Sequence, residues 1–477
     1  MNVDDFLEEL EGVIGSQYVL RDAKDTAPYL TDWRGIYQGV AIAVVLPKHT
    51  AQVASIVQIC RKYKIAIIPQ GGNTSLTGSA TPETTGAQIV LSLKRMNAIR
   101  NIDLQNQTMT LEAGCILQVA QEEASKHQVF FPLSLAAQGS CTIGGNLATN
   151  AGGTNVLRFG NARDLCLGLE VVTPQGEILH GLRGLRKDNT GYDLRNLFIG
   201  SEGTLGIITA AVMKLFAAPT KKSSALVAVS DFSDMLRLLQ FLQKRANAEL
   251  TAFEMMTRES IELTLQHFPQ FDIPLVHQAS FTILIELFEY QEDSSETATS
   301  MLESLLEEAM QQELLEDAVI ANSLAQVKDF WQIREHITLA QAKEPENLKF
   351  DISFALSKLE RFMTETGQML EDACPGIRII NFGHLGDGNL HYNLCAPKDA
   401  SKGYIASQGE RIQEIVYAQI DKYEGSISAE HGIGQLKREH LKAHRGDVAY
   451  EMMLAIKQAL DPENLFNPNK VLIPKQL

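Results

Sequence analysis

Several features that define protein classes are missing from this sequence of 477 residues. Its six cysteines are scattered and form no C-x-x-C pair, which excludes an iron–sulfur cluster of the usual spacing and provides no disulfide framework. No uninterrupted apolar run approaches the roughly 18 residues of a membrane span. The acidic, amphipathic stretch from Met1 to Leu10 resembles neither a signal peptide nor a transit peptide. We therefore expect a cytoplasmic protein with no membrane span.

Basic charge is also in deficit. The chain has 42 Lys and Arg against 58 Asp and Glu, a net charge of −16, which argues against nucleic acid and anionic membrane surfaces as partners. An anionic substrate would need specifically placed cations, because the overall field repels it. The hydrophobic content of 45% is that of a globular protein, and the length predicts two or three domains.

The chain lacks internal repeats, so its organisation follows from hydrophobic patterning. Short apolar runs, helical stretches and glycines alternate from about residue 39 to 216, an α+β mixture. We expect a helix from about 50 to 64. We expect strands at 41–46, 65–69, 89–93, 108–112, 167–172, 177–179 and 207–215.

The composition changes at about residue 222. A strand at 225–229, a helix from 231, a strand at 281–288 and an acidic helix at 294–315 suggest a ferredoxin-like α+β domain. Two helices, 435–444 and 448–460, dominate the last segment. The predicted parts are 1–220, 221–428 and 429–477, the last packing back on the first.

The most informative stretch, Asn381 to Asn393, has the pattern of a β-hairpin. Apolar residues flank Asp387-Gly388, and this dipeptide favours a two-residue type I′ turn because Gly accepts positive φ. Such a turn places His384 opposite His391, on a face that Asn393 shares. Cross-strand partners have Cβ atoms roughly 4.5–5.5 Å apart, which suits two imidazoles on one metal ion. The alternative is a hairpin with two solvated histidines.

A third ligand candidate, Glu430, lies beside His431 in the segment 426–434. Adjacent side chains diverge in an extended loop, so Glu430 can bind a metal ion while His431 faces a bound ligand. A His₂Glu set with an open position is typical of catalytic zinc sites, and such sets also take manganese, iron or cobalt. The alternative is an acid at a helix N-terminus followed by a surface histidine.

Three glycine-rich segments, 69–78, 139–153 and 197–208, fall in the first half. Successive amides in such loops form anion-binding nests suited to a pyrophosphate. None has the spacing G-x-G-x-x-G or that of a Walker loop, which excludes a Rossmann or kinase site. One such loop alone would more often be a plain turn, but three together predict a nucleotide ligand.

With Leu185–Tyr192, these segments resemble the FAD-binding domain of the vanillyl-alcohol oxidase/PCMH superfamily. The hairpin, Ala429–Gly434 and Asn467–Val471 are similar to the C-terminal half of its D-2-hydroxyacid dehydrogenase branch. The resemblance implies an α+β fold: a PCMH-type FAD-binding domain (1–220), a ferredoxin-like cap or substrate domain carrying the hairpin (221–428) and a short helical C-terminal segment (429–477).

The resemblance also implies bound FAD. No His occupies 71–75, where some relatives attach the flavin, so we expect non-covalent FAD. Ser75 stands where many relatives carry Gly, which requires a negative φ at Ser75. The implied FAD contacts are Pro69, Gln70, Gly71, Gly72, Asn73, Thr74, Ser75, Gly78, Pro132, Gly139, Ser140, Gly144, Gly145, Asn146, Ala148, Thr149, Asn150, Gly153, Glu202, Gly203, Gly206, Ile207, Ile208 and Asn469.

The metal ligands of the family fall on His384, His391 and Glu430, with zinc the first candidate. Its substrate-binding positions fall on Arg334, Thr338, Lys349, Asn393 and His431, and His431 would accept the hydroxyl proton. The residues alone support some of these roles, since Arg334 and Thr338 share a helix face at i and i+4 and Lys349 lies in an apolar strand, 348–353. The alternatives are a salt-bridged Arg and a snorkelling Lys.

The implied activity is oxidation of a D-2-hydroxyacid to the 2-oxoacid, with D-2-hydroxyglutarate to 2-oxoglutarate the first candidate and the hydride passing to the flavin. Two cations, Arg334 and Lys349, favour a dicarboxylate. A D-lactate or glycolate dehydrogenase is the alternative within the superfamily, and a non-catalytic flavin-binding subunit of a complex is the alternative outside enzymes. Electrons would leave through a partner such as electron-transferring flavoprotein or a quinone. A homodimer is common among relatives.

Overall fold

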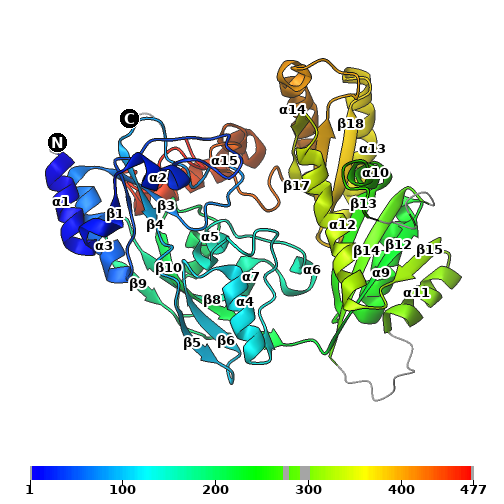
Figure 1. Ribbon diagram of the computed structural model, residues 1–477, viewed down its shortest axis with the longest axis horizontal. Coiled ribbons are helices and arrows are strands. Elements are labelled where there is room, and N and C mark those ends of the chain that lie inside the picture. The colour runs from blue at the N-terminus through cyan, green and yellow to red at the C-terminus, as the bar shows by residue number, and fades with distance from the viewer. Residues whose placement is uncertain (1–2, 272–274, 276–278, 291–300, 474–477) are drawn as a thin grey trace. The chain divides into compact units, whose positions relative to one another are not determined.

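The computed structural model describes residues 3–271, 275, 279–290 and 301–473 (Figure 1). The chain forms two compact units. Unit 1 comprises 1–152, 160–218 and 430–477, and unit 2 comprises 153–159 and 219–429. The short segment 153–159, which the sequence did not separate from the first half, thus belongs to the unit that carries the hairpin.

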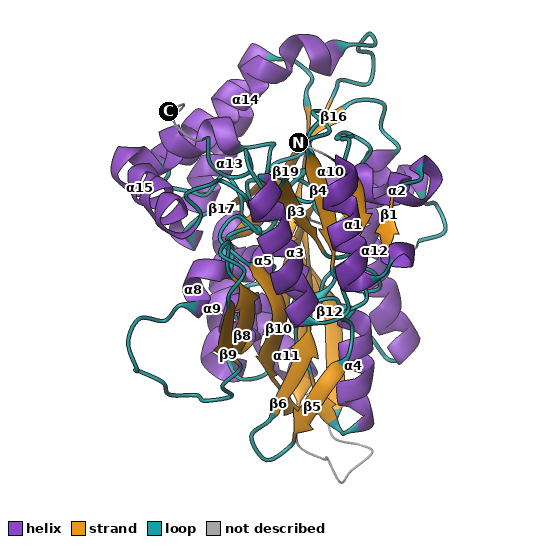
Figure 2. Cartoon of the chain, turned by 90° about the vertical axis from the view of Figure 1, so that its left-hand side faces the viewer, coloured by secondary structure: helices purple, strands orange, loops and turns teal. Residues whose placement is uncertain are grey.

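Unit 1 contains two main sheets. A mixed sheet has the strand order β1-β2-β4-β3, and an antiparallel sheet has the order β5-β6-β10-β8-β9, visible in Figure 2. Its strands are β1 (Val19–Leu20), β2 (Ala43–Val45), β3 (Ala66–Gln70), β4 (Gln88–Ser92), β5 (Ile99–Asp103), β6 (Thr108–Glu112), β7 (Val129–Phe130), β8 (Cys166–Val172), β9 (Ile178–Gly181), β10 (Ile207–Lys214) and β11 (Phe216–Ala217).

The helices of unit 1 cover the mixed sheet and frame its loops. Apolar side chains of α1 and α3 join those of β2, β3 and β4 in one core. The helices are α1 (Val3–Ile14), α2 (Ala23–Leu30), α3 (Thr50–Tyr63), α4 (Leu117–Lys126), α5 (Ile143–Ala148), α7 (Ala162–Leu165), α8 (Arg195–Phe198) and α15 (Arg438–Leu460), which breaks at Gly446, and the 3₁₀ turn η1 (Ser16–Tyr18).

Unit 2 is built on one antiparallel sheet with the order β15-β12-β14-β13-β18-β19-β16, and β17 also pairs with β19. Its strands are β12 (Lys221–Val229), β13 (Leu250–Thr257), β14 (Phe281–Glu289), β15 (Asp317–Ile320), β16 (Asn347–Leu348), β17 (Asp351–Ser353), β18 (Arg378–His384) and β19 (Asn389–Cys395). Its helical segments are α6 (Val156–Phe159), α9 (Phe232–Ala246), α10 (Arg258–His267), α11 (Met301–Gln311), α12 (Leu324–Ala342), α13 (Leu356–Ala373), η2 (Leu385–Asp387) and α14 (Tyr404–Lys422).

The strands and helices predicted for unit 2 from the sequence pattern are present. Their order is β12-α9-β13-β14-α11-β15, with α10 inserted after β13. This is the split βαβ arrangement of ferredoxin-like folds. The sequence pattern predicted two strands between the two helices, but only the one at 281–288 was located in the sequence; β13 is the other. The beginning of the predicted acidic helix, 294–300, lies outside the described residues, and its remainder is α11.

The hairpin forms, but its predicted turn and register are wrong. Phe382, not His384, pairs with His391, and a four-residue loop replaces the two-residue turn. The Asp387 side chain accepts a hydrogen bond from the Asn389 amide, and Leu385 is fully buried, which together favour the 3₁₀ turn η2. Because the register differs by two residues, His384 and His391 still share one face.

The predicted strand 348–353 is also wrong at its centre. The chain forms β16 and β17 instead, and Lys349 lies in the gap between them. The amide of Phe350 donates to the side chain of Asn393 (3.0 Å) and not to a strand backbone, so the ladder is interrupted there.

Candidate functional site

Unit 1 contains a cavity of about 270 Å³ walled by the three glycine-rich segments. The loop after β3, helix α5 with its flanks, and the turn before β10 supply most of the lining. The predicted FAD contacts in this lining are Pro69, Gln70, Gly71, Gly72, Asn73, Thr74, Ser75, Gly144, Gly145, Asn146, Ala148, Thr149, Glu202, Gly203, Gly206, Ile207 and Ile208. Glu430 and His431 line the same cavity.

The wall of the cavity requires glycine at two positions. A Cβ on Gly72 would lie 2.0 Å from the carbonyl oxygen of Ser140, and one on Gly71 would lie 2.3 Å from Oγ1 of Thr142. Asn73 adopts the left-handed region (φ 53), whereas Ser75 does not, which meets the condition set for Ser75. The loops therefore approach each other too closely for side chains, as a backbone cradle for a pyrophosphate demands.

Seven of the predicted FAD contacts lie outside this lining. Asn469 donates through its side chain to Glu83, and Asn150 accepts a bond from the Arg163 amide, so these two support the loops around the cavity. The sequence did not select other lining residues within the same segments, among them Leu76, Cys141 and Thr142. Those outside the lining are Gly78, Pro132, Gly139, Ser140, Asn150, Gly153 and Asn469.

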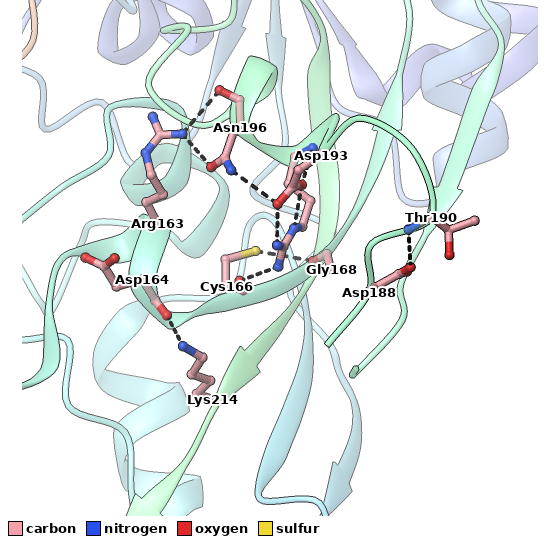
Figure 3. Close-up of polar contacts among 10 residues, drawn as sticks. Arg163, Asp164, Cys166, Gly168, Asp188, Thr190, Asp193, Asn196 and Lys214 are labelled. Atoms are coloured by element: carbon pink, nitrogen blue, oxygen red, sulfur yellow. Dashed lines mark hydrogen bonds and ion pairs between the residues drawn. The ribbon is translucent and has the colours of Figure 1, made fainter. Parts of the chain in front are cut away.

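The segment Leu185–Tyr192, which contributed to the resemblance, is an exposed loop. It is followed by a polar cluster in which Arg195 binds Asp193 and the carbonyl of Cys166 at the start of β8 (Figure 3). This cluster ties the end of the loop to the antiparallel sheet, and the loop itself does not line the cavity.

Glu202 holds the segment that follows Glu430 and His431. Its carboxylate accepts hydrogen bonds from the amides of Ile433 (2.7 Å) and Gly434 (2.9 Å). Burial raises the pKa of Glu202 to about 7, although these two amide bonds act to lower it. Glu202 was expected to contact FAD; the structure adds this second task, which joins two segments far apart in sequence.

In unit 2, His384 and His391 have ring centroids 5.6 Å apart. The Nδ1 of His384 lies 2.6 Å from Oε1 of Glu254 on β13. Candidate ligand atoms of His384, His391 and Glu430 all lie within 4.8 Å of one another. Glu430 directly follows Ala429 in sequence, and the amide of Ala429 donates to the carbonyl oxygen of Asp351 on β17.

The three side chains fit a divalent metal ion. Two imidazole nitrogens and one carboxylate oxygen form the donor set of catalytic zinc sites. An ionised carboxylate can only accept, so Nδ1 of His384 carries the hydrogen shared with Glu254, and Nε2 is the nitrogen of His384 that would bind a metal ion.

The predicted substrate residues differ in their surroundings. Arg334 is buried and its Nε donates to Oε2 of Glu254 (2.8 Å), whereas Thr338 and Lys349 are exposed. Asn393 is buried; it accepts from Phe350, and its Nδ2 donates to Gln341 (2.8 Å).

Sequence reasoning missed Glu254, which contacts both a predicted metal ligand and a predicted substrate residue. The available signal was a single acid inside the otherwise apolar run 252–256, a position where a buried carboxylate requires partners. All six cysteines are buried and free. Among the described residues, no helix is both long and apolar enough to cross a membrane.

Comparisons with known proteins agree with this architecture. Residues 41–181 match the family model "FAD binding domain", and residues 218–471 match "FAD linked oxidases, C-terminal domain". A p-cresol methylhydroxylase crystal structure has a similar fold (TM-score 0.77, 16% identity, 99% of this chain and 98% of that one). The predicted fold class, an α+β chain with a PCMH-type FAD-binding domain, is confirmed.

Similarity to curated proteins extends along the whole chain. A probable mitochondrial D-2-hydroxyglutarate dehydrogenase of Oryza sativa subsp. japonica is 37% identical over 473 residues, 99% of this chain and 82% of the relative. A D-2-hydroxyglutarate dehydrogenase of Xanthomonas citri pv. viticola is 36% identical, covering 94% and 92%. A D-2-hydroxyglutarate–pyruvate transhydrogenase of Saccharomyces cerevisiae is 33% identical, covering 94% and 90%.

Proposed function

Because this chain belongs to the FAD-linked oxidase family and is an FAD-dependent dehydrogenase, we propose that it oxidises D-2-hydroxyglutarate to 2-oxoglutarate with the help of a divalent metal ion. The observation that supports the metal is the grouping of His384, His391 and Glu430 within 4.8 Å. A flavin-binding subunit without catalysis would have no use for such an open donor set next in sequence to a histidine, His431.

Each residue has a proposed task. FAD supplies a hydride acceptor when bound, and a metal ion supplies a Lewis acid that lowers the pKa of a coordinated hydroxyl. His384, His391 and Glu430 hold the metal ion. His431 accepts the proton of the 2-hydroxyl. Asn393 offers its remaining Nδ2 hydrogen to the C1 carboxylate.

The distal carboxylate distinguishes a dicarboxylate from lactate. We assign it to Arg334, whose Nη atoms are not needed for the Nε bond to Glu254, with Thr338 and Lys349 as further donors. The electron acceptor stays a prediction, with electron-transferring flavoprotein or a quinone as the candidates. The yeast relative is named as a transhydrogenase that uses pyruvate, so a second 2-oxoacid is a further candidate. The cytoplasmic location and the homodimer also stay predictions, and the rice relative is named as mitochondrial.

The test is a visible spectrum of the purified, anaerobic, zinc-loaded protein during addition of D-2-hydroxyglutarate, L-2-hydroxyglutarate, D-lactate and D-malate in turn. We expect rapid loss of the flavin band with D-2-hydroxyglutarate and slower or no loss with the others. A chelator should abolish the loss while the flavin stays bound.

Two outcomes would contradict the proposal. Bleaching by D-lactate alone would assign the chain to the D-lactate dehydrogenases and remove the distal-carboxylate role of Arg334. A flavin band unchanged by every acid, with FAD bound and zinc present, would show that the chain does not oxidise these 2-hydroxyacids.

A further inference from the structure

One buried carboxylate in unit 2 contacts two functional side chains from different elements. Glu254 of β13 is 1% exposed, His384 at the end of β18 is 8% exposed, and Arg334 in the middle of α12 is 7% exposed. Oε1 of Glu254 lies 2.6 Å from Nδ1 of His384, and Oε2 lies 2.8 Å from Nε of Arg334. Each oxygen of Glu254 therefore has its own partner.

The position of Glu254 follows from the sheet. It pairs with His384 across the antiparallel β13–β18 ladder, so their side chains lie on the same face, and α12 packs against that face through Ile333 and Ile337. The guanidinium of Arg334 also stacks on Phe382, 4.7 Å from the ring centroid. Strand pairing and helix packing thus fix the carboxylate from two directions.

A carboxylate in this position controls the chemistry of the imidazole. It accepts the Nδ1 hydrogen of His384, which selects the tautomer with its lone pair on Nε2 and fixes the ring plane. The other oxygen of Glu254 binds the guanidinium of Arg334, which stays charged in proteins, so the acceptor for His384 is one member of a buried ion pair.

We propose that Glu254 is a positioning residue that orients His384 toward the metal ion and holds Arg334 at a set place relative to it, so that metal binding and recognition of the distal carboxylate depend on one side chain. This inference rests on the proposed function and deepens it. Neither partner needs to touch the other for the coupling, because both are fixed to the same rigid group.

The first test is the affinity of the FAD-loaded, metal-free protein for Zn²⁺, measured by competition with a chromophoric chelator. Glu254→Gln keeps the shape of the side chain but removes the charge and presents an amide nitrogen to one of its donor partners. We expect Zn²⁺ affinity to fall about 10- to 100-fold, the range for loss of a carboxylate behind a metal-bound histidine. Bound flavin, measured from its absorbance, should stay at the wild-type amount.

The matched control is Glu286→Gln. Glu286 is also a buried acid, on the neighbouring strand β14, and it accepts from Trp331 of the same helix α12 (3.0 Å) and from Ser224 (3.3 Å). It has no bond to His384 in the structure. Its loss should lower thermal stability without changing Zn²⁺ affinity, which separates general damage to the sheet from the specific effect.

The second test concerns the substrate. Glu254→Gln should also raise KM for D-2-hydroxyglutarate more than KM for D-lactate, measured at saturating Zn²⁺, because lactate has no distal carboxylate. Should the single variant fail to fold, Glu254→Gln combined with Arg334→Met removes the unpaired buried guanidinium and should still show the weakened Zn²⁺ binding.

The possible outcomes separate the role of Glu254 from the existence of the metal site. Suppose that His391→Ala abolishes Zn²⁺ binding but Glu254→Gln binds Zn²⁺ as tightly as the wild type. This result would overturn the role of Glu254 and support the metal site. Zn²⁺ binding that His391→Ala does not alter would overturn the metal site and Glu254 with it. Equal weakening by Glu254→Gln and Glu286→Gln would show that Glu254 acts only through the stability of the sheet.

Discussion

Glu202 is a buried carboxyl of unit 1 whose protonation is linked to folding. Its pKa in the folded protein is about 7, against 4.5 for an unperturbed glutamate, because burial disfavours the charged form. The folded state therefore binds more protons than the unfolded state between these two values. Stability should fall as pH rises from about 4.5 to about 7 and then level off, by on the order of 2–3 kcal/mol.

Glu202→Gln should remove this contribution. From pH 5 to pH 8 the free energy of unfolding of the wild type should fall through Glu202, whereas the variant lacks this fall because its amide stays neutral. The variant should therefore gain stability relative to the wild type as pH rises. Release of flavin fluorescence on heating reports on unfolding of unit 1 and would measure it at both pH values. An identical difference at pH 5 and pH 8 would contradict the assignment.

At the scale of residues, the sequence was sufficient to select candidate ligand residues but not the residues that they contact. His384, His391 and Glu430 could be selected because ligand chemistry and local strand spacing are both visible in the sequence. The contacts of Glu254 and Glu202 could not, because 130 residues separate Glu254 from His384 and 231 separate Glu202 from Ile433. Only the folded sheet order and the return of the C-terminal segment bring them together.

At the scale of elements, the hairpin shows where local rules fail. Asp387-Gly388 was expected to form the whole turn, but burial of Leu385 and the side-chain bond from Asp387 favour a longer loop. The observed register differs from the predicted one by an even number of residues, so each side chain stays on its predicted face of the sheet. The two histidines therefore share one face, as predicted, although the turn is longer. The face of the metal ligands was therefore predictable, whereas their register was not.

Gly388 is the residue on which this loop depends. It adopts φ +81, and a Cβ there would lie 2.2 Å from the carbonyl oxygen of Phe354. Gly403 is a matched control in the same unit, with φ +93 and nothing within 4 Å of its Cβ position. Gly403→Ala should cost only the left-handed strain, about 1–2 kcal/mol. Gly388→Ala should cost more, because backbone must also move.

Thermal unfolding and Zn²⁺ affinity would both be measured on the two glycine variants. We expect Gly388→Ala to lower the midpoint more than Gly403→Ala and to weaken Zn²⁺ binding, since the loop joins the strands that carry His384 and His391. Equal midpoints would show that the loop can shift away from Phe354 at no cost.

At the scale of the whole molecule, apolar runs predicted most strands of unit 1 to within two or three residues, because most of them are buried on both faces. The order of strands in the sheets and the membership of 153–159 in unit 2 were not predictable, since both are set by packing between distant segments. The PCMH-type fold was predicted from the family resemblance and not from the hydrophobic pattern.

The two units should respond to different ligands. Unit 1 contains most of the residues that match the FAD-binding domain, 41–181, whereas His384 and His391 belong to unit 2. The chain has two tryptophans, Trp33 and Trp331, one in each unit. Trp33→Phe would leave Trp331, which binds Glu286 in the unit 2 sheet, as a fluorescence reporter of unit 2, while flavin fluorescence reports on unit 1.

Zn²⁺ at a concentration of 100 Kd should stabilise the state that binds it by about 2.7 kcal/mol. We expect the Trp331 transition to move to higher temperature with Zn²⁺ and back with a chelator, while the flavin transition moves less. His391→Ala should cancel the Zn²⁺ shift and leave flavin binding intact. Equal movement of both signals would contradict this prediction, because it would show that the two units unfold as one cooperative body.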